Sequence, residues 1–247
     1  MEPLKKIFPF MCAAILASCG PSAAALPTTR AISLTIAFTP AVQPIIPALQ
    51  TCASFQEQVH LNLVETPSQA LDLTTSDLAF HLGEPAELPK FAAPLVWDRI
   101  VVVLHPDNPV KQLSHGQVRD LISGRARQWG KGAVSEVQPW VPTAESDYRA
   151  AFQQAVMAGS LESPAALLAP NPAGMLRAVA ADPNAIGYLP RAWVTDEVKV
   201  IDLNVPILVL ALAAEEPEGP ARILLACLQS AIGQAALSDH YMLLADE

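Results

Sequence analysis

Residues 95–129 decide the fold: LVWDRIVVVLHPDNPVKQLSHGQVRDLISGRARQW. Ile100–Leu104 is a run of β-branched and apolar residues, the composition of a strand that is buried on both faces. Two prolines then end that strand, because proline cannot donate a hydrogen bond to a sheet. Ser114 can cap a short helix over residues 115–123, and Gly124 ends it. A strand, a loop and a capped helix in this order predict half of a βα unit.

The composition indicates a folded protein with an acidic surface. The chain has 247 residues, of which 51% are hydrophobic and 16% charged, and its formal net charge is −9. Such a chain can bury a large core, either as one domain or as two lobes of roughly 100 residues each. No basic run follows Lys6. Because a negative surface repels phosphate groups, we expect no nucleic-acid partner.

The first 20 residues have the features of a targeting segment. Two lysines precede an apolar run over residues 7–17, which is too short to span a bilayer. Leu-Ala-Ser-Cys at residues 16–19 resembles the bacterial lipobox, where cleavage precedes the cysteine and a lipid is attached to its sulfur. The resemblance implies a signal peptide at 1–18, a lipid on Cys19 and a tether over 19–29. The alternative is a plain secretory signal that is cut near residues 23–25.

The four cysteines have different expected fates. Cys12 leaves with the signal peptide and Cys19 receives the lipid, so Cys52 and Cys227 remain in the folded protein. In an oxidising compartment these two can pair, or they can be two small buried apolar side chains. The sequence has no CxxC motif and no Cys/His cluster, so we predict neither a metal site nor a cofactor.

The order of apolar segments predicts an α/β protein. Early in the chain, strands over 31–38, 59–64 and 77–81 alternate with helices over 41–55 and 69–73. Pro44 and Pro47 confine regular helix to the second half of 41–55. This order implies a parallel sheet, with ligands at the carboxyl ends of its strands. After a proline-rich connector we expect strands over 136–141, 185–189 and 205–212, and helices over 147–158, 173–181 and 217–237.

Three segments resemble phosphate-binding proteins, the extracytoplasmic receptors of ABC phosphate importers. They are VVVLHPDNPVKQLS with QVRDLISGR, from residue 101 onward, then NAIGYLP at 184–190, and GQA with HY within 233–241. They occur in the order that the family shows. The resemblance implies a periplasmic-binding-protein-like type II fold, with two mostly parallel sheets flanked by helices and joined by two crossing strands.

In this fold, residues 30–97 and 191–247 form the first lobe and residues 98–190 the second, and the strand at 185–189 recrosses to the first lobe. The resemblance implies a monomeric lipoprotein, extracytoplasmic and anchored to a bacterial membrane. It would close on a small, phosphate-like anionic solute and deliver it to the permease of an ABC-type importer. An enzyme is not expected, because the sequence lacks the common hydrolase, metalloprotease and nucleotide-loop motifs.

The resemblance also implies a solute site between the lobes. Family members hold an oxyanion with backbone N–H groups at helix starts, hydroxyl groups, an arginine and an acidic residue. The matching positions are Thr39, Ala41, Ser68 and Asp77 in the first lobe, and Ser146, Asp147, Tyr148 and Arg149 in the second. Thr39 and Ser68 can instead be helix caps, and Asp77 a solvated carboxylate at the end of a strand.

The second-lobe loop departs from the family pattern, which reads approximately Arg-x-x-x-Ser-Gly-Thr-Arg-x-x-Phe. Ser146 and Arg149 match it, but Pro142 replaces the arginine, Asp147 the glycine and Tyr148 the threonine. A carboxylate about 6 Å from an anion opposes its binding by about 3 kcal/mol at an effective dielectric constant near 20. A helix start contributes only about 0.3–1 kcal/mol.

The side chain of Asp147 therefore has two interpretations. It faces the cleft and weakens anion binding, or it lies in water and only stabilises its own helix. The first interpretation favours a second function on the same fold, namely a ligand-poor envelope interaction or signalling protein.

Overall fold

The computed structural model describes residues 31–130 and 136–244, which belong to one compact unit. Its strands are β1 (Ile32–Phe38), β2 (Val59–Glu65), β3 (Leu78–Leu82), β4 (Phe91–Leu104), β5 (Gln138–Pro142), β6 (Leu167–Ala169), β7 (Ala185–Pro190) and β8 (Lys199–Ala213). Its α-helices are α1 (Ile46–Ala53), α2 (His115–Ile122), α3 (Asp147–Phe152), α4 (Pro172–Ala181), α5 (Gly219–Gln229) and α6 (Ala231–Leu237). The signal peptide, Cys19 and the tether lie outside the described residues.

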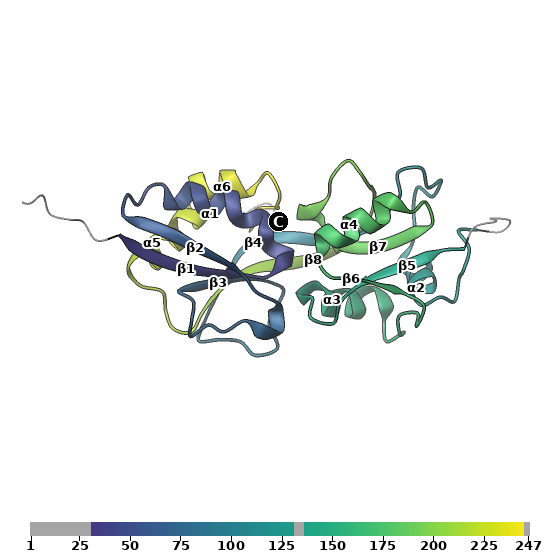
Figure 1. The fold of residues 1–247 in the computed structure, drawn as a ribbon, viewed down its shortest axis with the longest axis horizontal. Coiled ribbons are helices and arrows are strands. Elements are labelled where there is room, and N and C mark those ends of the chain that lie inside the picture. Colours follow the sequence, from purple (N-terminus) through teal and green to yellow (C-terminus); the bar gives the residue numbers. More distant parts are fainter. Residues whose placement is uncertain (1–30, 131–135, 245–247) are drawn as a thin grey trace, which may run out of the picture. The chain divides into compact units, whose positions relative to one another are not determined.

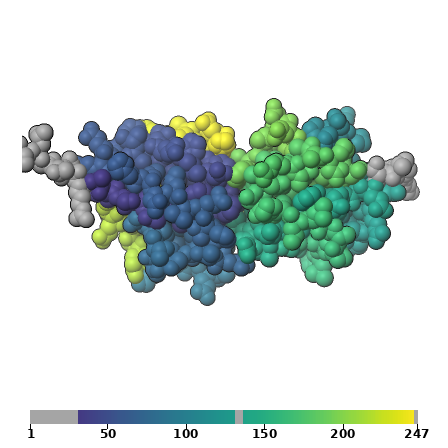
Figure 2. Space-filling view, viewed as in Figure 1, coloured from purple at the N-terminus to yellow at the C-terminus, as the bar shows by residue number. Residues whose placement is uncertain are grey.

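The described strands form one sheet of eight, in the order β2-β1-β3-β8-β4-β7-β5-β6. The two long central strands, β4 and β8, are antiparallel to each other and run through both halves of the sheet. On one side of them lie β1–β3 with α1, α5 and α6, and on the other β5–β7 with α2–α4 (Figure 1). The space-filling view separates the same halves by colour, blue and yellow against green (Figure 2). The predicted two-lobed α/β fold is confirmed.

The strand that returns to the first lobe is β8, not β7. β7 stays in the second lobe, where it pairs with the end of β4 and with β5. β8 begins beside Leu104 of β4 in the second lobe and ends beside β3 in the first. The expected recrossing at residues 185–189 is therefore wrong. The predicted segment at 205–212 is the second half of this longer strand.

The predicted parallel pairing holds within each lobe. β1 pairs in parallel with β2 and β3, and β5 pairs in parallel with β6 and β7. β3 is buried along its whole length, as its neighbours and the covering side chains exclude water from both faces. The carboxyl ends of β1 and β3 consequently lie together, and so do those of β5 and β6.

The helix expected over 41–55 is regular only in its second half, as predicted. Its first half is a 3-10 turn, Pro40–Ile45, because Pro44 and Pro47 cannot donate to the helix. The helices expected over 69–73 and 217–237 differ from the structure. The helix expected over 69–73 is only the short 3-10 turn Ser68–Ala70. The long helix expected over 217–237 is broken at Ser230, whose backbone is extended, and this break separates α5 from α6.

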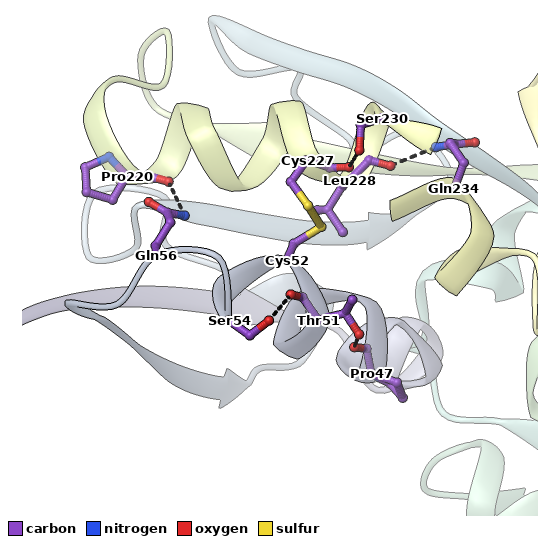
Figure 3. Close-up of a disulfide and its surroundings, with 10 residues drawn as sticks. All are labelled: Pro47, Thr51, Cys52, Ser54, Gln56, Pro220, Cys227, Leu228, Ser230 and Gln234. Atoms are coloured by element: carbon purple, nitrogen blue, oxygen red, sulfur yellow. Dashed lines mark hydrogen bonds between the residues drawn. A yellow bond between two sulfur atoms is a disulfide. The ribbon is translucent and has the colours of Figure 1, made fainter. Parts of the chain in front are cut away.

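A disulfide joins two of the helices that cover the first lobe. Cys52 of α1 and Cys227 of α5 are bonded, with 5.6 Å between their Cα atoms and a sequence separation of 175 residues (Figure 3). Nearby, the Gln56 side chain donates to the carbonyl of Pro220. Of the two interpretations of these cysteines, the structure thus contains the bonded pair.

Two helices of the second lobe, α2 and α4, begin with side-chain caps. The Ser114 side chain accepts a hydrogen bond from the Gln117 N–H, and the Gln117 side chain accepts one from the Ser114 N–H, which makes a capping box at the start of α2. Asn171 caps α4 through the Gly174 N–H.

Among the described residues, no helix combines the length and apolar character needed to cross a bilayer.

Candidate functional site

The first-lobe side of the site is built where β1 leaves the sheet. The Thr39 N–H donates to the carbonyl of Phe80 at 3.1 Å, which extends the pairing of β1 with β3 by one bond. Pro40 then turns the chain away. On the other edge of β3, the Gly83 N–H donates to Leu208 of β8 at 2.7 Å. Because N–H directions alternate along a strand, the Leu82 N–H points to the side that β1 has left.

The second-lobe side consists of two loops that follow β5 and β6. After β5, the Ser146 N–H donates to the carbonyl of Thr143 and the chain enters α3. After β6, Asn171 caps α4, whose first residue is Pro172. Both loops lie at the carboxyl ends of parallel strands, which is where α/β sheets place their ligands.

These loops enclose a small cavity, with a volume of about 50 Å³. Its lining comes from both lobes: Thr39, Pro40, Ala41, Pro67, Thr143, Glu145, Ser146, Asp147, Tyr148, Pro170, Asn171 and Pro172. We call it the inter-lobe cavity. About 10–15 Å³ of such volume is needed to hold one water molecule, so the cavity has room for a few water molecules.

The Asp147 carboxylate spans from the second lobe to the first. Its Oδ2 accepts hydrogen bonds from Thr39 Oγ1 at 2.5 Å and from the Leu82 N–H at 3.1 Å. Its Oδ1 accepts from the N–H of Tyr148 at 3.0 Å. Of the two interpretations of this side chain, the one that places it in water is therefore wrong. Asp147 faces the cleft and contacts the opposite lobe.

Burial raises the pKa of the Asp147 carboxyl, because it disfavours the charged form. The nearby imidazole of His81, the Thr39 hydroxyl and the Leu82 and Tyr148 N–H groups act in the opposite direction. His81 is only 2% exposed and lies behind the cavity. The charged side chains that line the cavity are both acidic, Glu145 and Asp147, and no lysine or arginine is among the lining residues.

Five of the eight predicted site residues line the inter-lobe cavity: Thr39, Ala41, Ser146, Asp147 and Tyr148. Thr39 is 1% exposed and makes no side-chain capping bond to the turn that follows, so the cap interpretation of Thr39 is wrong. Tyr148 is also 1% exposed, and its hydroxyl has no hydrogen-bond partner among the residues that the structure describes. Burial, followed by the charge of Asp147, raises the pKa of this phenol.

Ser68 lies behind the cavity and does not line it. Its hydroxyl is 2.7 Å from His81 Nε2, and His81 Nδ1 is 2.9 Å from the carbonyl of Gly83. Since a carbonyl only accepts, Nδ1 carries a proton and donates to Gly83, and Nε2 shares a hydrogen bond with the Ser68 hydroxyl. Ser68 therefore helps to orient His81, and it makes no side-chain cap to its own turn.

Asp77 and Arg149, expected in the site, point elsewhere. Asp77 precedes β3 and is exposed, so it lies at the amino end of the strand, where its carboxylate accepts from the Thr35 N–H. Arg149 is ion-paired with Glu162, which also accepts from the Tyr188 hydroxyl at 2.9 Å. The solvated interpretation of Asp77 agrees with this placement. Arg149 is not available to a solute in the cavity.

Two groups that shape the site could not be predicted from residue types. The Leu82 N–H belongs to the backbone, so the identity of the side chain carries no signal for it. Glu162 lies in a loop without a motif, yet it determines the direction of Arg149. His81 did have a signal, since it ends the strand predicted over 77–81 and carboxyl ends of strands are ligand-facing positions.

Comparisons with known proteins agree with this architecture. The chain is similar to a protein described as a phosphate ABC transporter substrate-binding protein, with bound phosphate, from Clostridium perfringens: 19% identity, 86% of this chain and 100% of that chain covered, TM-score 0.77. It is also similar to an ABC-type phosphate transport receptor from Vibrio cholerae, with 18% identity, coverages of 85% and 99%, and a TM-score of 0.67.

A protein of another kind shares the fold. The reduced OxyR regulatory domain from Pseudomonas aeruginosa is 13% identical, with 81% of this chain and 98% of that chain covered and a TM-score of 0.59. At such identities the likeness establishes the fold alone. A search of curated protein sequences finds no match. The model of one family, described as the PBP superfamily domain, matches residues 76–224, more than half of the chain. The chain therefore belongs to the PBP superfamily.

Proposed function

We propose that this protein is the extracytoplasmic solute-binding component of an ABC-type importer, and that it binds a small anionic, phosphate-like solute in the inter-lobe cavity. The observation that carries the proposal is that the buried hydroxyl-bearing Thr39 and the Ser146 loop, from opposite lobes, line the same small space. Two structurally similar proteins are described as phosphate transport receptors, which supports the same solute class.

The size and donors of the cavity suit a small oxyanion. A cavity of about 50 Å³ has room for a few water molecules, which suits a small oxyanion better than a sugar or a peptide. The Thr39 hydroxyl lies at the first-lobe side of the cavity, and together with the Leu82 N–H it now holds a carboxylate oxygen of Asp147. An oxygen of phosphate or sulfate accepts the same two hydrogen bonds.

Calorimetric titration of the full chain with phosphate, sulfate and molybdate tests the solute class. We expect heat of binding with at least one of them, and a loss of at least tenfold in affinity in Thr39→Val, which removes the hydroxyl and keeps the shape. Thr51→Val makes the same change at an exposed threonine of α1 and should bind as the wild type does. No heat with any oxyanion would reject the phosphate-like solute.

The membrane anchor is a separate part of the proposal. The lipobox-like Leu-Ala-Ser-Cys at residues 16–19 supports cleavage before Cys19 and attachment of a lipid to its sulfur. We expect the full chain, made in a bacterium, to fractionate with the membrane as a monomer and to be released in Cys19→Ala. Membrane association that persists unchanged in Cys19→Ala would contradict the anchor.

One observation favours a second function on the same fold, a ligand-poor envelope interaction or signalling protein. The Asp147 carboxylate already uses the first-lobe donors, and Arg149 is engaged by Glu162. The same calorimetric titration distinguishes the two functions, because a ligand-poor protein gives no heat with any of the three oxyanions.

A further inference from the structure

We infer that Asp147 is a built-in occupant of an oxyanion cradle, so that the protein's own carboxylate competes with the solute for the same two donors. The cradle is the pair formed by Thr39 Oγ1 and the Leu82 N–H. The inference deepens the proposed function, and it rests on that function only for the statement that a solute oxygen reaches this cradle.

The cradle is held in place by the sheet, independently of Asp147. The Thr39 N–H is bonded to Phe80 of β3, which fixes the backbone that carries the hydroxyl. The bond from Gly83 to Leu208 of β8 fixes the direction of the preceding Leu82 N–H. Two donors held on rigid strands and converging on one oxygen form a preorganised site for a carboxylate or a tetrahedral oxyanion.

The occupant comes from the other lobe. Asp147 is the first residue of α3, and its bonds to Leu82 and Thr39 join positions 65 and 108 residues apart in sequence. Only Oδ2 enters the cradle, because Oδ1 accepts from the Tyr148 N–H. The contact thus joins the lobes through the same kind of hydrogen bonds that an anionic solute would make.

The Asp147 carboxylate and a solute oxygen cannot occupy the cradle at the same time. When a solute oxygen enters the cradle, Asp147 must leave it while remaining attached to the same cavity wall. A carboxylate about 6 Å away, at an effective dielectric constant near 20, then weakens anion binding by about 100-fold. Glu145 also lines the cavity, but it makes no hydrogen bond to the cradle atoms. Removing the Glu145 charge therefore serves as a matched control, because this charge lies at the cavity but does not occupy the cradle.

Calorimetric titration with phosphate and with acetate tests the inference on the full chain. Asp147→Ala empties the cradle, and we expect it to bind phosphate at least tenfold more tightly than both the wild type and Glu145→Ala. Acetate, which reproduces the lost carboxylate, should bind to Asp147→Ala and not measurably to the wild type. Adding Thr39→Val to Asp147→Ala should abolish both gains, which would assign them to the cradle.

The outcomes separate this inference from the proposed function. Binding in Asp147→Ala without binding in the wild type would uphold the cradle and reject solute binding by the natural protein. Tight binding by the wild type that Asp147→Ala does not improve would uphold the solute and overturn the inference. Equal gains in Asp147→Ala and Glu145→Ala would also overturn it, since charge alone would then explain them.

A second pair of variants covers the case in which Asp147→Ala does not fold, as judged by its circular dichroism. Asp147→Asn and Glu145→Gln each remove one charge and keep the side-chain shape. A neutral amide holds the cradle less strongly than a carboxylate does. We therefore expect Asp147→Asn to gain at least tenfold more phosphate affinity than Glu145→Gln. An equal gain in the two variants would overturn the inference.

Discussion

Asp98 is a carboxylate that the folded protein buries in the crossing strand β4, with an exposure of 3%. It accepts hydrogen bonds from the Arg99 N–H at 2.6 Å and from the Ala192 N–H at 3.3 Å. Burial raises the pKa of Asp98 from its ordinary value of 3.8 to about 7, although these bonds and the charge of Arg191 lower it. The stability of the protein should therefore depend on pH through this residue.

The sign follows from proton binding. Between about pH 4 and pH 7 the folded chain holds a proton on Asp98 that the unfolded chain has lost, so the free energy of unfolding falls as the pH rises. The contribution of Asp98 is fully present below pH 3.8 and lost above about pH 7. One pKa unit corresponds to 1.36 kcal/mol, so the difference between the two pKa values amounts to about 4 kcal/mol.

Asp98→Asn removes the titration and keeps an acceptor oxygen. Urea unfolding followed by tryptophan fluorescence at pH 4.5 and pH 8 gives the free energies of unfolding. From pH 4.5 to pH 8 the wild type should lose about 3 kcal/mol more than Asp98→Asn, because most of the titration falls in this interval. The comparison uses the change in the free energy of unfolding between the two pH values. Any destabilisation by the amide that is the same at both pH values therefore cancels.

Asp196→Asn is the matched control, because it makes the same change at an exposed aspartate. It should follow the wild type at both pH values. If Asp98→Asn loses as much stability between pH 4.5 and pH 8 as the wild type does, the buried carboxyl does not titrate as described and the reasoning fails.

Two further predictions concern the helices of the first lobe. Reducing the Cys52–Cys227 disulfide should lower the free energy of unfolding by up to about 5 kcal/mol, because the bond restricts the unfolded chain by linking residues 175 positions apart. Reductant should not affect a variant with serine at both positions. Gly233→Ala should cost about 1–3 kcal/mol in urea unfolding, because its Cβ would lie 2.3 Å from the carbonyl oxygen of Cys227. Gly130→Ala, with open space around it, should change little, and equal effects at the two glycines would contradict the packing argument.

Much of the fold could be predicted because its signals are local. Periodicity located most strands of both lobes but missed β6 and the first halves of β4 and β8, and Ser114 was recognised as a cap from its residue type and position. The break at Ser230 was missed, because the helical pattern over 217–237 continues through it. It depends on how α6 packs against the end of α5, where Gly233 meets backbone atoms of Cys227 and Leu228.

The candidate site was predicted in position but not in its contacts. Thr39 and the Ser146 loop could be found because they match site positions of the family that the sequence resembles, and each follows a predicted strand, whose carboxyl end is a ligand-facing position. The partner of Arg149 could not be found, because Glu162 lies in a loop whose path depends on the packing of the second lobe.

The sequence by itself determined the α/β class, because this follows from the spacing of apolar residues and from residues that end strands and cap helices. Its resemblance to phosphate-binding proteins indicated the two-lobed order and the loops that supply the site. The tertiary structure alone decided that β8 recrosses to the first lobe, that Cys52 meets Cys227 and that Asp147 enters the cradle. Each of these depends on the distance and direction between groups far apart in the chain, which only the packed lobes define.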